Sequence, residues 1–372
     1  MSTFYELGVT KDFVKGLKEL GIKHPTEIQE ATIPALLKST TDFIGLAQTG
    51  TGKTAAYGLP ILQNIDADLT EVQALILSPT RELAQQIKKQ LFKFTKYIEP
   101  KIFVEAVYGG EKIEKQQKAL RRTTHIIVAT PGRLIDLMER GEVDLQNIKT
   151  LVIDEADEIL SMGFKQDLNR ILRYTGRHKK TWLFSATFPT EIQKIVKTYM
   201  SPKALRIEVN KSILINANIT HQYIKTSIKG KLHLLAKLLD KRAGERGIIF
   251  CRTKASTRNA TSFLKEEGFS AAALEGDMQQ REREKVMRAF KKGSLPLLVA
   301  TDVAARGIDV TNLSFIIHYQ LPEKIDYYTH RSGRTARAGK KGTSIALIIP
   351  NELQKIHEIQ KALNIQFTEI NR

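Results

Sequence analysis

The segment after the first short apolar run has residues suited to binding a nucleoside triphosphate. Residues 47–54 read AQTGTGKT, a phosphate-loop pattern with alanine in place of the usual first glycine. Gly50 and Gly52 allow backbone amides to curl round phosphate oxygens, Lys53 can reach the β- and γ-phosphates, and the Thr54 hydroxyl can ligate Mg²⁺. The alternative is a glycine-rich turn followed by an incidental lysine. An apolar run before the segment and a helical pattern after it favour the phosphate loop.

A second segment with potential chemistry follows the apolar run TLVI, where the sequence reads DEAD. A buried strand that ends at Asp154 would place a carboxylate near a metal, and Glu155 would then orient an attacking water. The alternative is that these acids, with Asp157, simply favour the start of a helix. Beside a phosphate loop, the segment predicts hydrolysis of the triphosphate.

A basic segment far along the chain, YTHRSGRTARAG, carries Arg331, Arg334 and Arg337 at every third position beside His330. Such a run is often a solvated face or a contact to a phosphate backbone. Arginines can also neutralise charge on a transferring phosphoryl group, an effect worth roughly 10³ to 10⁵ in rate. The spacing therefore predicts that the second half of the chain assists hydrolysis.

Upstream of the phosphate loop, Thr26 and Gln29 fit a capping box, in which each side chain satisfies a backbone amide at a helix start. A glutamine amide can also pair with adenine N6 and N7, one donor and one acceptor matched to one acceptor and one donor. The two roles are compatible, because Thr26 can start the helix and so direct Gln29 to adenine.

The order of apolar and amphipathic segments predicts an α/β fold with two domains. Short apolar runs alternate with helical patterns, as expected for mostly parallel sheets with helices on both faces. Residues 210–220 interrupt the alternation and predict a linker between domains at 1–209 and 221–372. The predicted strands are DFIGLA, VQALILS, KIFVEAVY, HIIVAT, TLVIDEAD, TWLFSAT and ALRIEVN in the first half, and QYIKTSI, RGIIFCRT, SAAALEG, PLLVATD, SFIIHYQ and GTSIALIIP in the second.

Composition narrows the class of protein. The 372 residues include 58 Lys+Arg and 40 Asp+Glu, and the net charge of +18 predicts attraction to polyanions such as nucleic acid or anionic membrane. No apolar stretch approaches the roughly 20 residues of a membrane span, and the start of the chain lacks signal-peptide character. No amphipathic stretch is basic on one face without also serving a core, so membrane binding is disfavoured. The single cysteine, Cys251, excludes an internal disulfide and is expected to be a small buried hydrophobe. We expect a soluble, cytoplasmic protein.

Taken in order, these and further segments resemble the motif series of a DEAD-box ATP-dependent RNA helicase of superfamily 2. The resemblance spans about Phe4 to Pro350. It rests on GIKHPTEIQ, AQTGTGKT, PTRELAQQ, GG, TPGR, DEAD, SAT, IIFCRT, QQRER, VATDVAARGID and HRSGRTARAG. It implies two RecA-like domains that clamp single-stranded RNA when ATP is bound and separate short duplexes locally. The implied catalytic residues are Lys53, Asp154, Glu155, Arg334 and Arg337.

The resemblance also assigns the nucleotide site. The implied ligands of Mg²⁺ are Thr54 and Asp154, and Asp309 would contact the ribose of ATP from the second domain; a lone carboxylate in a turn is the alternative for Asp309. The implied nucleotide-binding residues are Phe4, Ile22, Thr26, Gln29, Gln48, Thr49, Gly50, Thr51, Gly52, Lys53, Thr54 and Asp309.

The implied RNA site mixes arginine and threonine side chains with glycine turns, which suits phosphate and sugar contacts rather than base reading. Ordinary loop geometry is the alternative for each glycine or proline. The residues are Pro79, Thr80, Arg81, Gly109, Gly110, Thr130, Pro131, Gly132 and Arg133 in the first domain, and Arg252, Thr253, Gln280, Arg283, Thr301 and Asp302 in the second. A preference for RNA over DNA through the 2′-hydroxyl comes from the resemblance alone.

Ser185, Thr187, His330 and Arg331 are implied to couple hydrolysis to RNA binding. For Ser185 and Thr187 the alternative is an N-terminal cap for the helix in PTEIQKIVKTYM.

The sequence departs from the family pattern at three positions. Ile22 stands where an aromatic residue usually packs on adenine, Glu275 where histidine is common, and Ser332 where isoleucine is common. The sequences of the later motifs, VATDVAARGIDV and YTHRSGRTARAG, are similar to those of bacterial members of the cold-shock and ribosome-assembly group. This likeness implies a monomer that works with ribosome-assembly or RNA-decay complexes. A translocating DNA helicase and a non-hydrolysing, ATP-gated RNA clamp are the rival functions; the glutamine element with DEAD and SAT disfavours the first, and intact Glu155 with both arginines disfavours the second.

Overall fold

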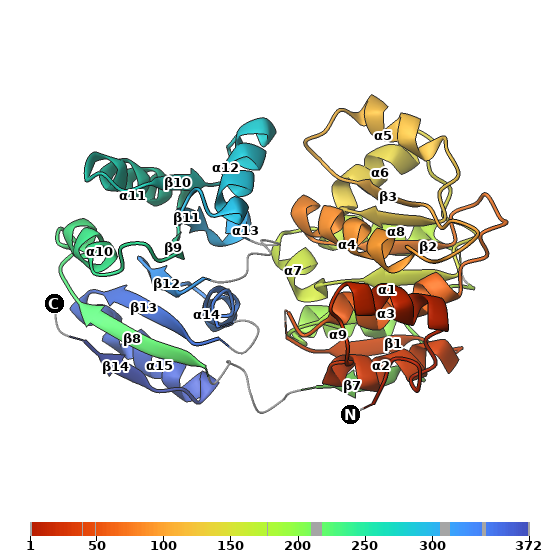
Figure 1. The fold of residues 1–372 in the computed structure, drawn as a ribbon, viewed down its shortest axis with the longest axis horizontal. Coiled ribbons are helices and arrows are strands. Elements are labelled where there is room, and N and C mark those ends of the chain that lie inside the picture. Colours follow the sequence, from red (N-terminus) through yellow and green to blue (C-terminus); the bar gives the residue numbers. More distant parts are fainter. Residues whose placement is uncertain are drawn as a thin grey trace. The chain divides into compact units, whose positions relative to one another are not determined.

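A computed structural model of the chain describes residues 2–38, 40–48, 50–176, 178–209, 218–305, 313–336 and 340–370. The chain divides into two compact units, Met1–Lys211 and Ser212–Arg372. Each unit is an α/β sandwich with one parallel sheet between helices (Figure 1).

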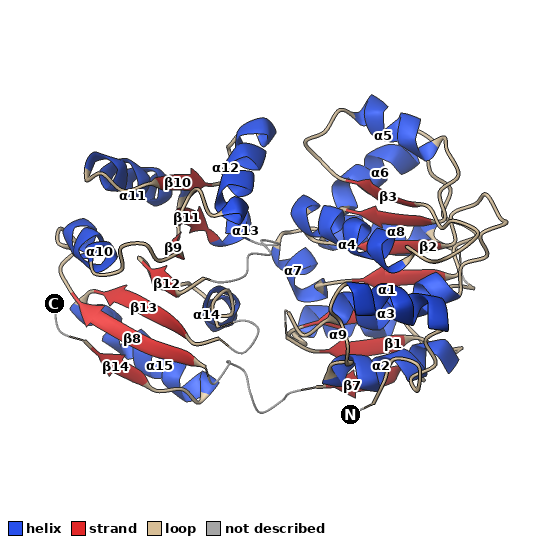
Figure 2. Cartoon of the chain, in the orientation of Figure 1, coloured by secondary structure: helices blue, strands red, loops and turns tan. Residues whose placement is uncertain are grey.

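The helices and strands alternate along most of the chain (Figure 2). In the first unit they are α1 (Lys11–Glu19), α2 (Glu27–Lys38), β1 (Phe43–Leu46), α3 (Lys53–Gln63), β2 (Ala74–Leu77), α4 (Arg81–Phe94), β3 (Val104–Val107), α5 (Ile113–Leu120), β4 (Ile126–Ala129), α6 (Pro131–Glu139), β5 (Thr150–Ile153), α7 (Ala156–Ser161), α8 (Lys165–Tyr174), β6 (Lys180–Ser185), α9 (Thr190–Tyr199) and β7 (Leu205–Glu208). In the second they are β8 (Ile219–Lys225), α10 (Lys231–Asp240), β9 (Gly247–Cys251), α11 (Lys254–Glu266), β10 (Ala271–Leu274), α12 (Gln280–Lys292), β11 (Leu297–Thr301), α13 (Asp302–Ala305), β12 (Phe315–His318), α14 (Ile325–Ser332), β13 (Gly342–Ile348), a 3₁₀ turn (Pro350–Glu352), α15 (Leu353–Leu363) and β14 (Phe367–Glu369).

The sheet of the first unit has the strand order β3-β4-β2-β5-β6-β1-β7, and all its pairings are parallel. Its central strands are buried on both faces, which explains why they read as continuous apolar runs. Helices α1 to α4 cover one face around Leu91 and Phe184, and α6 to α9 cover the other around Ile153 and Leu168.

The register of this sheet brings the ends of its strands to one edge. Leu77 pairs with both Ala129 and Ile153, and Leu46 pairs with Ser185. The segments after β1, β2, β4, β5 and β6 therefore begin side by side. In open α/β sheets this carboxyl edge is where ligands bind.

The sheet of the second unit has the order β10-β11-β9-β12-β13-β8-β14, again with parallel pairings. Phe315 and Ile317 face α10 and α11, while Ile316 faces α12 and α13. A third cluster around Tyr328 and Ile356 packs α14 and α15 against the sheet.

The structure confirms the predicted fold class and contains a strand in each predicted apolar run. It adds β14, a three-residue strand that is too short to show a hydrophobic period. Strand β8 begins at Ile219, inside the segment predicted as a linker over 210–220. Residues 210–217 of that segment lie outside the described residues, and the proposed domain limits remain a prediction.

Candidate nucleotide and RNA site

The phosphate loop joins β1 to α3 and is shaped by glycines in the left-handed region. Gly50 has φ 82° and Gly52, the N-cap of α3, has φ 93°. A Cβ atom at Gly52 would lie 2.4 Å from Gln29 Nε2, so a larger residue has both a conformational and a steric cost. Lys53 is buried, and its Nζ donates a 2.7 Å hydrogen bond to the Ala47 carbonyl across the loop. This hydrogen bond ties the lysine back to the start of its own loop.

Gln29 ties α2 to the phosphate loop with both ends of its amide. Its Oε1 accepts a hydrogen bond from the Thr26 amide at 3.0 Å, and its Nε2 donates to the Gly52 carbonyl at 3.0 Å. The Thr26 hydroxyl donates to the Thr51 carbonyl at 2.8 Å. The glutamine half of the predicted capping box is thus present, while the threonine hydroxyl is directed to the loop. Contact of Gln29 with adenine remains a prediction.

The other predicted nucleotide residues of the first unit surround this loop or pack beneath it. The Gln48 carbonyl accepts a 2.8 Å hydrogen bond from the Thr51 hydroxyl, which holds the turn. Phe4 is buried in the core cluster of α1 to α4, and Ile22 packs at its border. Thr49 and Asp309 lie outside the described residues.

Asp154 follows β5 and is almost fully buried at the carboxyl edge of the sheet. Its Oδ2 accepts a 2.9 Å hydrogen bond from the hydroxyl of Tyr57, and its Oδ1 accepts one from the Glu155 amide at 3.0 Å. Burial raises the pKa of Asp154, opposed by attraction to Lys53 and by these hydrogen bonds. A buried carboxylate whose charge is poorly stabilised favours a nearby cation.

Sequence reasoning missed Tyr57. It lies one helical turn after Lys53 and Thr54 on α3, and its hydroxyl reaches Asp154. Burial raises the pKa of Tyr57 well above its usual value, so the phenol stays a hydrogen-bond donor. A tyrosine one turn after the lysine and threonine of the phosphate loop was the available signal.

Glu155 adopts a conformation that is unusual for a residue with a side chain, φ 49° and ψ 53°, at the N-cap of α7. Strained backbone of this kind costs of order 1 kcal/mol and is found mainly at functional sites. This turn ends β5 and starts α7, and the Glu155 amide within it holds Asp154 Oδ1.

The SAT segment after β6 is bonded to the DEAD segment. Asp157 Oδ2 accepts hydrogen bonds from the backbone amide and the hydroxyl of Thr187 at 2.9 and 3.0 Å. The Asp157 amide donates to the Ser185 hydroxyl at 3.3 Å. The alternative that Ser185 and Thr187 cap the next helix is wrong, because α9 begins at Thr190 behind Pro189, without a side-chain cap.

Three predicted RNA segments of the first unit gather at the ends of β2, β4 and β3. Thr80 caps α4, accepting a hydrogen bond from Leu83, and Arg81 lies with its guanidinium 4.8 Å from the centre of the Tyr108 ring. Thr130 is the N-cap of α6, with Pro131 in its first position. Pro79, Gly109 and Gly110 lie in the connections after β2 and β3, and Gly132 lies in the first turn of α6.

Tyr108 and Gln116, which sequence reasoning missed, join these segments. Gln116 Nε2 donates to the Tyr108 carbonyl at 2.9 Å, and Gln116 Oε1 accepts from Arg133 at 3.0 Å. Arg133 also donates to the Glu111 carbonyl at 3.0 Å. Arg133 is therefore held against the connection that follows β3 rather than pointing freely to solvent.

In the second unit, Arg331 is buried and makes a two-pronged ion pair with Asp302, at 2.5 and 2.6 Å. It also donates to the Gln320 carbonyl at 2.8 Å. Arg331 thus braces the start of α13 against α14, while Arg334 Nε contacts the carbonyl of His330 at 3.3 Å. Arg337 lies outside the described residues.

The remaining predicted RNA residues of the second unit lie at the carboxyl ends of β9 and β11 and at the start of α12. The Arg252 amide donates to Gln320 Oε1, and Thr253 caps α11. Gln280 begins α12, and Arg283 donates to the Ala304 carbonyl at 2.8 Å. Thr301 accepts a 3.4 Å hydrogen bond from Ala304.

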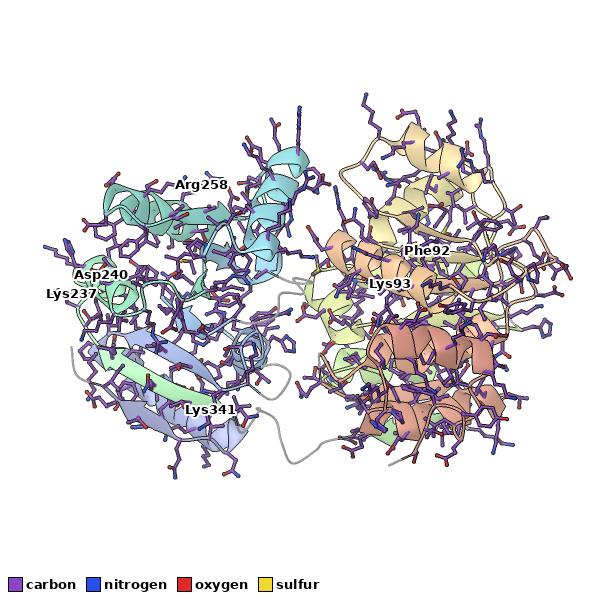
Figure 3. The ribbon with its side chains drawn as sticks, in the orientation of Figure 1. Phe92, Lys93, Lys237, Asp240, Arg258 and Lys341 are labelled. Carbon is purple, nitrogen blue, oxygen red and sulfur yellow. The ribbon has the colours of Figure 1, made fainter. Side chains whose placement is uncertain are left out.

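Two departures from the family pattern have structural explanations. Glu275 is buried, accepts two hydrogen bonds from Arg258 of α11 at 2.9 and 2.6 Å, and accepts the Asp277 amide at 2.8 Å. Arg258 is labelled in Figure 3. Ser332 is buried, and its hydroxyl oxygen lies 2.9 Å from that of Ser344. The Ser344 hydroxyl oxygen in turn lies 3.0 Å from His318 Nε2. Both side chains complete buried polar networks.

Two parallel-sheet units, one of them with a phosphate loop beside a buried acidic segment, define a RecA-like nucleoside-triphosphate-dependent motor. The family profile for the DEAD/DEAH box helicase matches residues 26–195, and that for the helicase conserved C-terminal domain matches residues 230–339. The chain belongs to the DEAD-box family of ATP-dependent RNA helicases.

Its relatives include curated bacterial proteins. It is 40% identical over 361 residues to the DEAD-box ATP-dependent RNA helicase CshA of Geobacillus kaustophilus. This alignment covers 97% of this chain and 76% of the relative. It is 42% identical over 364 residues to the ATP-dependent RNA helicase CshA of Limosilactobacillus reuteri. That alignment covers 98% of this chain and 72% of the relative. It is also similar to a solved structure of S. cerevisiae Dbp5 bound to RNA and ADP BeF3. The TM-score is 0.91, the identity 31%, and the coverage 100% of this chain and 96% of that one.

No helix in the described part of the chain is both long and apolar enough to cross a membrane.

Proposed function

We propose that the chain hydrolyses ATP in response to RNA, binds single-stranded RNA through its sugar-phosphate backbone, and separates short duplexes or remodels RNA–protein complexes. The observation that carries the proposal is the link from α3 through Tyr57 to buried Asp154, since it joins the phosphate loop to the acidic segment. Family membership adds the RNA substrate.

For nucleotide binding, we propose that Lys53 leaves the Ala47 carbonyl and moves to the β- and γ-phosphates. Gln29 would read the adenine edge while its Nε2 still contacts the loop, which makes base recognition and loop shape interdependent. Thr54 and Asp154 would hold Mg²⁺, which supplies charge neutralisation at the phosphates; one hydroxyl and one buried carboxylate suit this hard cation, which keeps several waters and phosphate oxygens as ligands.

For hydrolysis, Glu155 is proposed to orient the attacking water and accept its proton; its left-handed backbone, typical of functional sites, supports this role. Arg334 and Arg337 would stabilise the charge on the transferring phosphoryl group when the two domains approach each other. ATP can favour that approach only by binding more tightly to the closed state.

For RNA binding, the proposed contacts are backbone amides at Gly109 and Gly110, the N-terminus of α6, and the side chains of Arg81 and Arg133. The predicted RNA-binding residues of the second domain would bind the same RNA strand. We expect a cytoplasmic monomer that works on RNA in ribosome assembly or decay.

The test is ATPase activity measured with a single-stranded RNA, with the DNA of the same sequence, and without nucleic acid. Strong stimulation by RNA alone supports the proposal. Equal stimulation by DNA would favour a DNA helicase, and no hydrolysis with bound RNA would favour a passive clamp.

A further inference from the structure

Strand β3 forms an open edge of the first sheet. Among the strands of the described residues, it pairs with β4 alone. The carbonyls of Phe103 and Val107 accept hydrogen bonds from that side, from Ile126 at 3.2 Å and Thr130 at 3.0 Å. Because backbone groups alternate in direction along a strand, those of Val104 and Ala106 face away from β4. Within the described residues, no hydrogen bond joins them to a loop, helix or side chain. The edge has free pairing capacity.

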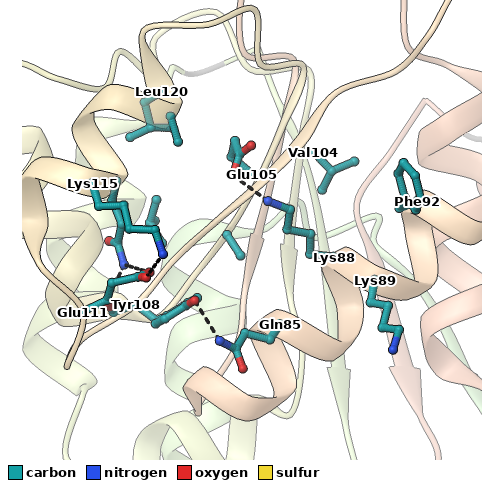
Figure 4. A pocket seen from close by; sticks show the side chains of 14 residues that line it. Gln85, Lys88, Lys89, Phe92, Val104, Glu105, Tyr108, Glu111, Lys115 and Leu120 are labelled. Carbon is teal, nitrogen blue, oxygen red and sulfur yellow. Dashed lines mark hydrogen bonds and ion pairs between the residues drawn. The ribbon is translucent and has the colours of Figure 1, made fainter. Parts of the chain in front are cut away.

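A cavity of about 420 Å³ follows this edge (Figure 4). All four residues of β3 line it, although successive side chains of a strand point to opposite faces. The cavity therefore runs along the edge of the strand rather than over one face. Its walls are α4, with Gln85, Lys88, Lys89 and Phe92, and α5, with Lys115, Gln116, Ala119 and Leu120. The volume is typical of ligand sites, roughly 300–1,000 Å³.

An ion pair lies across the edge. Val104 packs in the core cluster on the α4 side of the sheet, whereas Val107 packs in the cluster on the opposite face. Because side chains alternate along a strand, Glu105 points to the same face as Val107. Lys88 of α4 nevertheless contacts Glu105, with 2.6 Å between Nζ and Oε2 (Figure 4). Charged side chains at an edge discourage unwanted pairing. A strand that enters must replace Glu105 as the partner of Lys88, and a carboxylate can do so.

Three lysines and two glutamates line the cavity, so positive charge is in excess. Lys89 is exposed and makes no ion pair within the described residues, and Lys115 meets Glu111 at 2.6 Å. Phe92 is 71% exposed on α4, where Figure 3 labels it with Lys93. Lysines beside apolar side chains suit a segment in which acidic and apolar residues alternate.

We propose that the open edge of β3 binds an extended, acidic segment of a partner protein, which pairs with the strand as an eighth strand of the sheet. The backbone groups of Val104 and Ala106 supply affinity by strand addition, and Lys88 and Lys89 select carboxylates. This surface contains none of the phosphate-loop residues, whereas Tyr108 and Gln116 at its border also join the proposed RNA segments.

The experiment uses the full chain and a phage-displayed library of random seven-residue peptides. Binders are selected on the unsubstituted protein after depletion on Ala106→Pro, which removes the outward N–H while leaving the pairing with β4 intact, as at edge prolines. Circular dichroism and ATPase activity verify that the variant is folded. The expected result is enrichment of peptides with alternating acidic and apolar residues.

The consensus peptide is then synthesised with and without N-methylated backbone amides on its pairing edge. N-methylation and Lys88→Gln should each weaken binding about tenfold, as loss of hydrogen bonds or of a charge-assisted contact predicts. Glu105→Gln should tighten binding, because it releases Lys88. Neither Lys88→Gln nor Glu105→Gln depends on the strand tolerating proline.

The proposal is overturned if no peptide is enriched, or if the N-methylated peptide binds equally well. It is also overturned if a single-stranded RNA displaces the peptide and loses affinity in Lys88→Gln, since the cavity is then an RNA path. Self-association that Ala106→Pro abolishes would assign the edge to a second copy of the chain, with the same consequence.

Discussion

Thr187 donates two hydrogen bonds to one oxygen of Asp157, from its amide at 2.9 Å and from its hydroxyl at 3.0 Å. The two residues lie after neighbouring strands, β5 and β6. The segment that contains Glu155 is therefore attached directly to the SAT segment. We propose that this contact couples hydrolysis to RNA binding, because movement of one segment would change the hydrogen bonds of the other.

Thr187→Val removes the hydroxyl hydrogen bond and retains the amide one. We expect RNA-stimulated ATPase to fall less than about twofold and unwinding of a short duplex to fall about fivefold, since one hydrogen bond is worth roughly 1 kcal/mol. Thr198→Val, on the exposed side of α9, is the matched control. Parallel losses of both activities would argue against a coupling role.

Gln29→Glu keeps the acceptor for the Thr26 amide but places a carboxylate oxygen against the Gly52 carbonyl. Two acceptors then face each other beside a phosphate site, so KM for ATP should rise at least tenfold. Gln29→Ala should instead mainly reduce the preference for ATP over GTP. Steady-state kinetics with both nucleotides measure this, with Gln193→Glu on exposed α9 as control. An unchanged preference in Gln29→Ala would leave a helix cap as its role.

Asp154→Asn should stabilise the protein while abolishing ATPase activity. Burial raises the pKa of Asp154, so the folded state binds its proton more readily than the unfolded chain. Above the folded pKa the ionised group lowers the free energy of unfolding, and this penalty disappears as the pH falls through that pKa. The thermal midpoint of Asp154→Asn should therefore exceed that of the unsubstituted protein at neutral pH, by about 2–4 °C for each kcal/mol.

The advantage of Asp154→Asn should shrink in acid, and melting curves without nucleotide from neutral to acidic pH measure it. A lower midpoint at neutral pH would show that attraction to Lys53 outweighs burial.

Ser332→Ile restores the residue common in the family but should destabilise this chain. Isoleucine would remove the Ser332 hydroxyl, which is a hydrogen-bond partner of Ser344 and His318 in a fully buried site. Burial lowers the pKa of His318 well below its usual range, so the imidazole cannot compensate by becoming charged. We expect a loss of about 1–3 kcal/mol in urea unfolding followed by circular dichroism. Ser294→Ile, on an exposed turn, is the control, and equal stability of the two variants would contradict this explanation.

Much of the fold follows from sequence because parallel strands that are buried on both faces leave long apolar runs, as β2 and β5 do. The site positions follow from the rule that ligands bind at strand ends. The sequence does not reveal hydrogen bonds that depend on packing between distant segments. Tyr57 and Gln116 have no motif of their own, and their roles appear only when α3 meets β5 and α5 meets α6. Strand β14 was missed because three residues are too few to show a period.

The central claim is that Glu155 activates the water that hydrolyses ATP in response to RNA. The most direct measurement is the RNA-stimulated ATPase rate of Glu155→Gln, an isosteric change that leaves the shape of the site intact. We predict a fall in kcat of at least about 10² with RNA binding retained in the presence of ATP, as expected for loss of a general base. Full activity in Glu155→Gln would contradict the account.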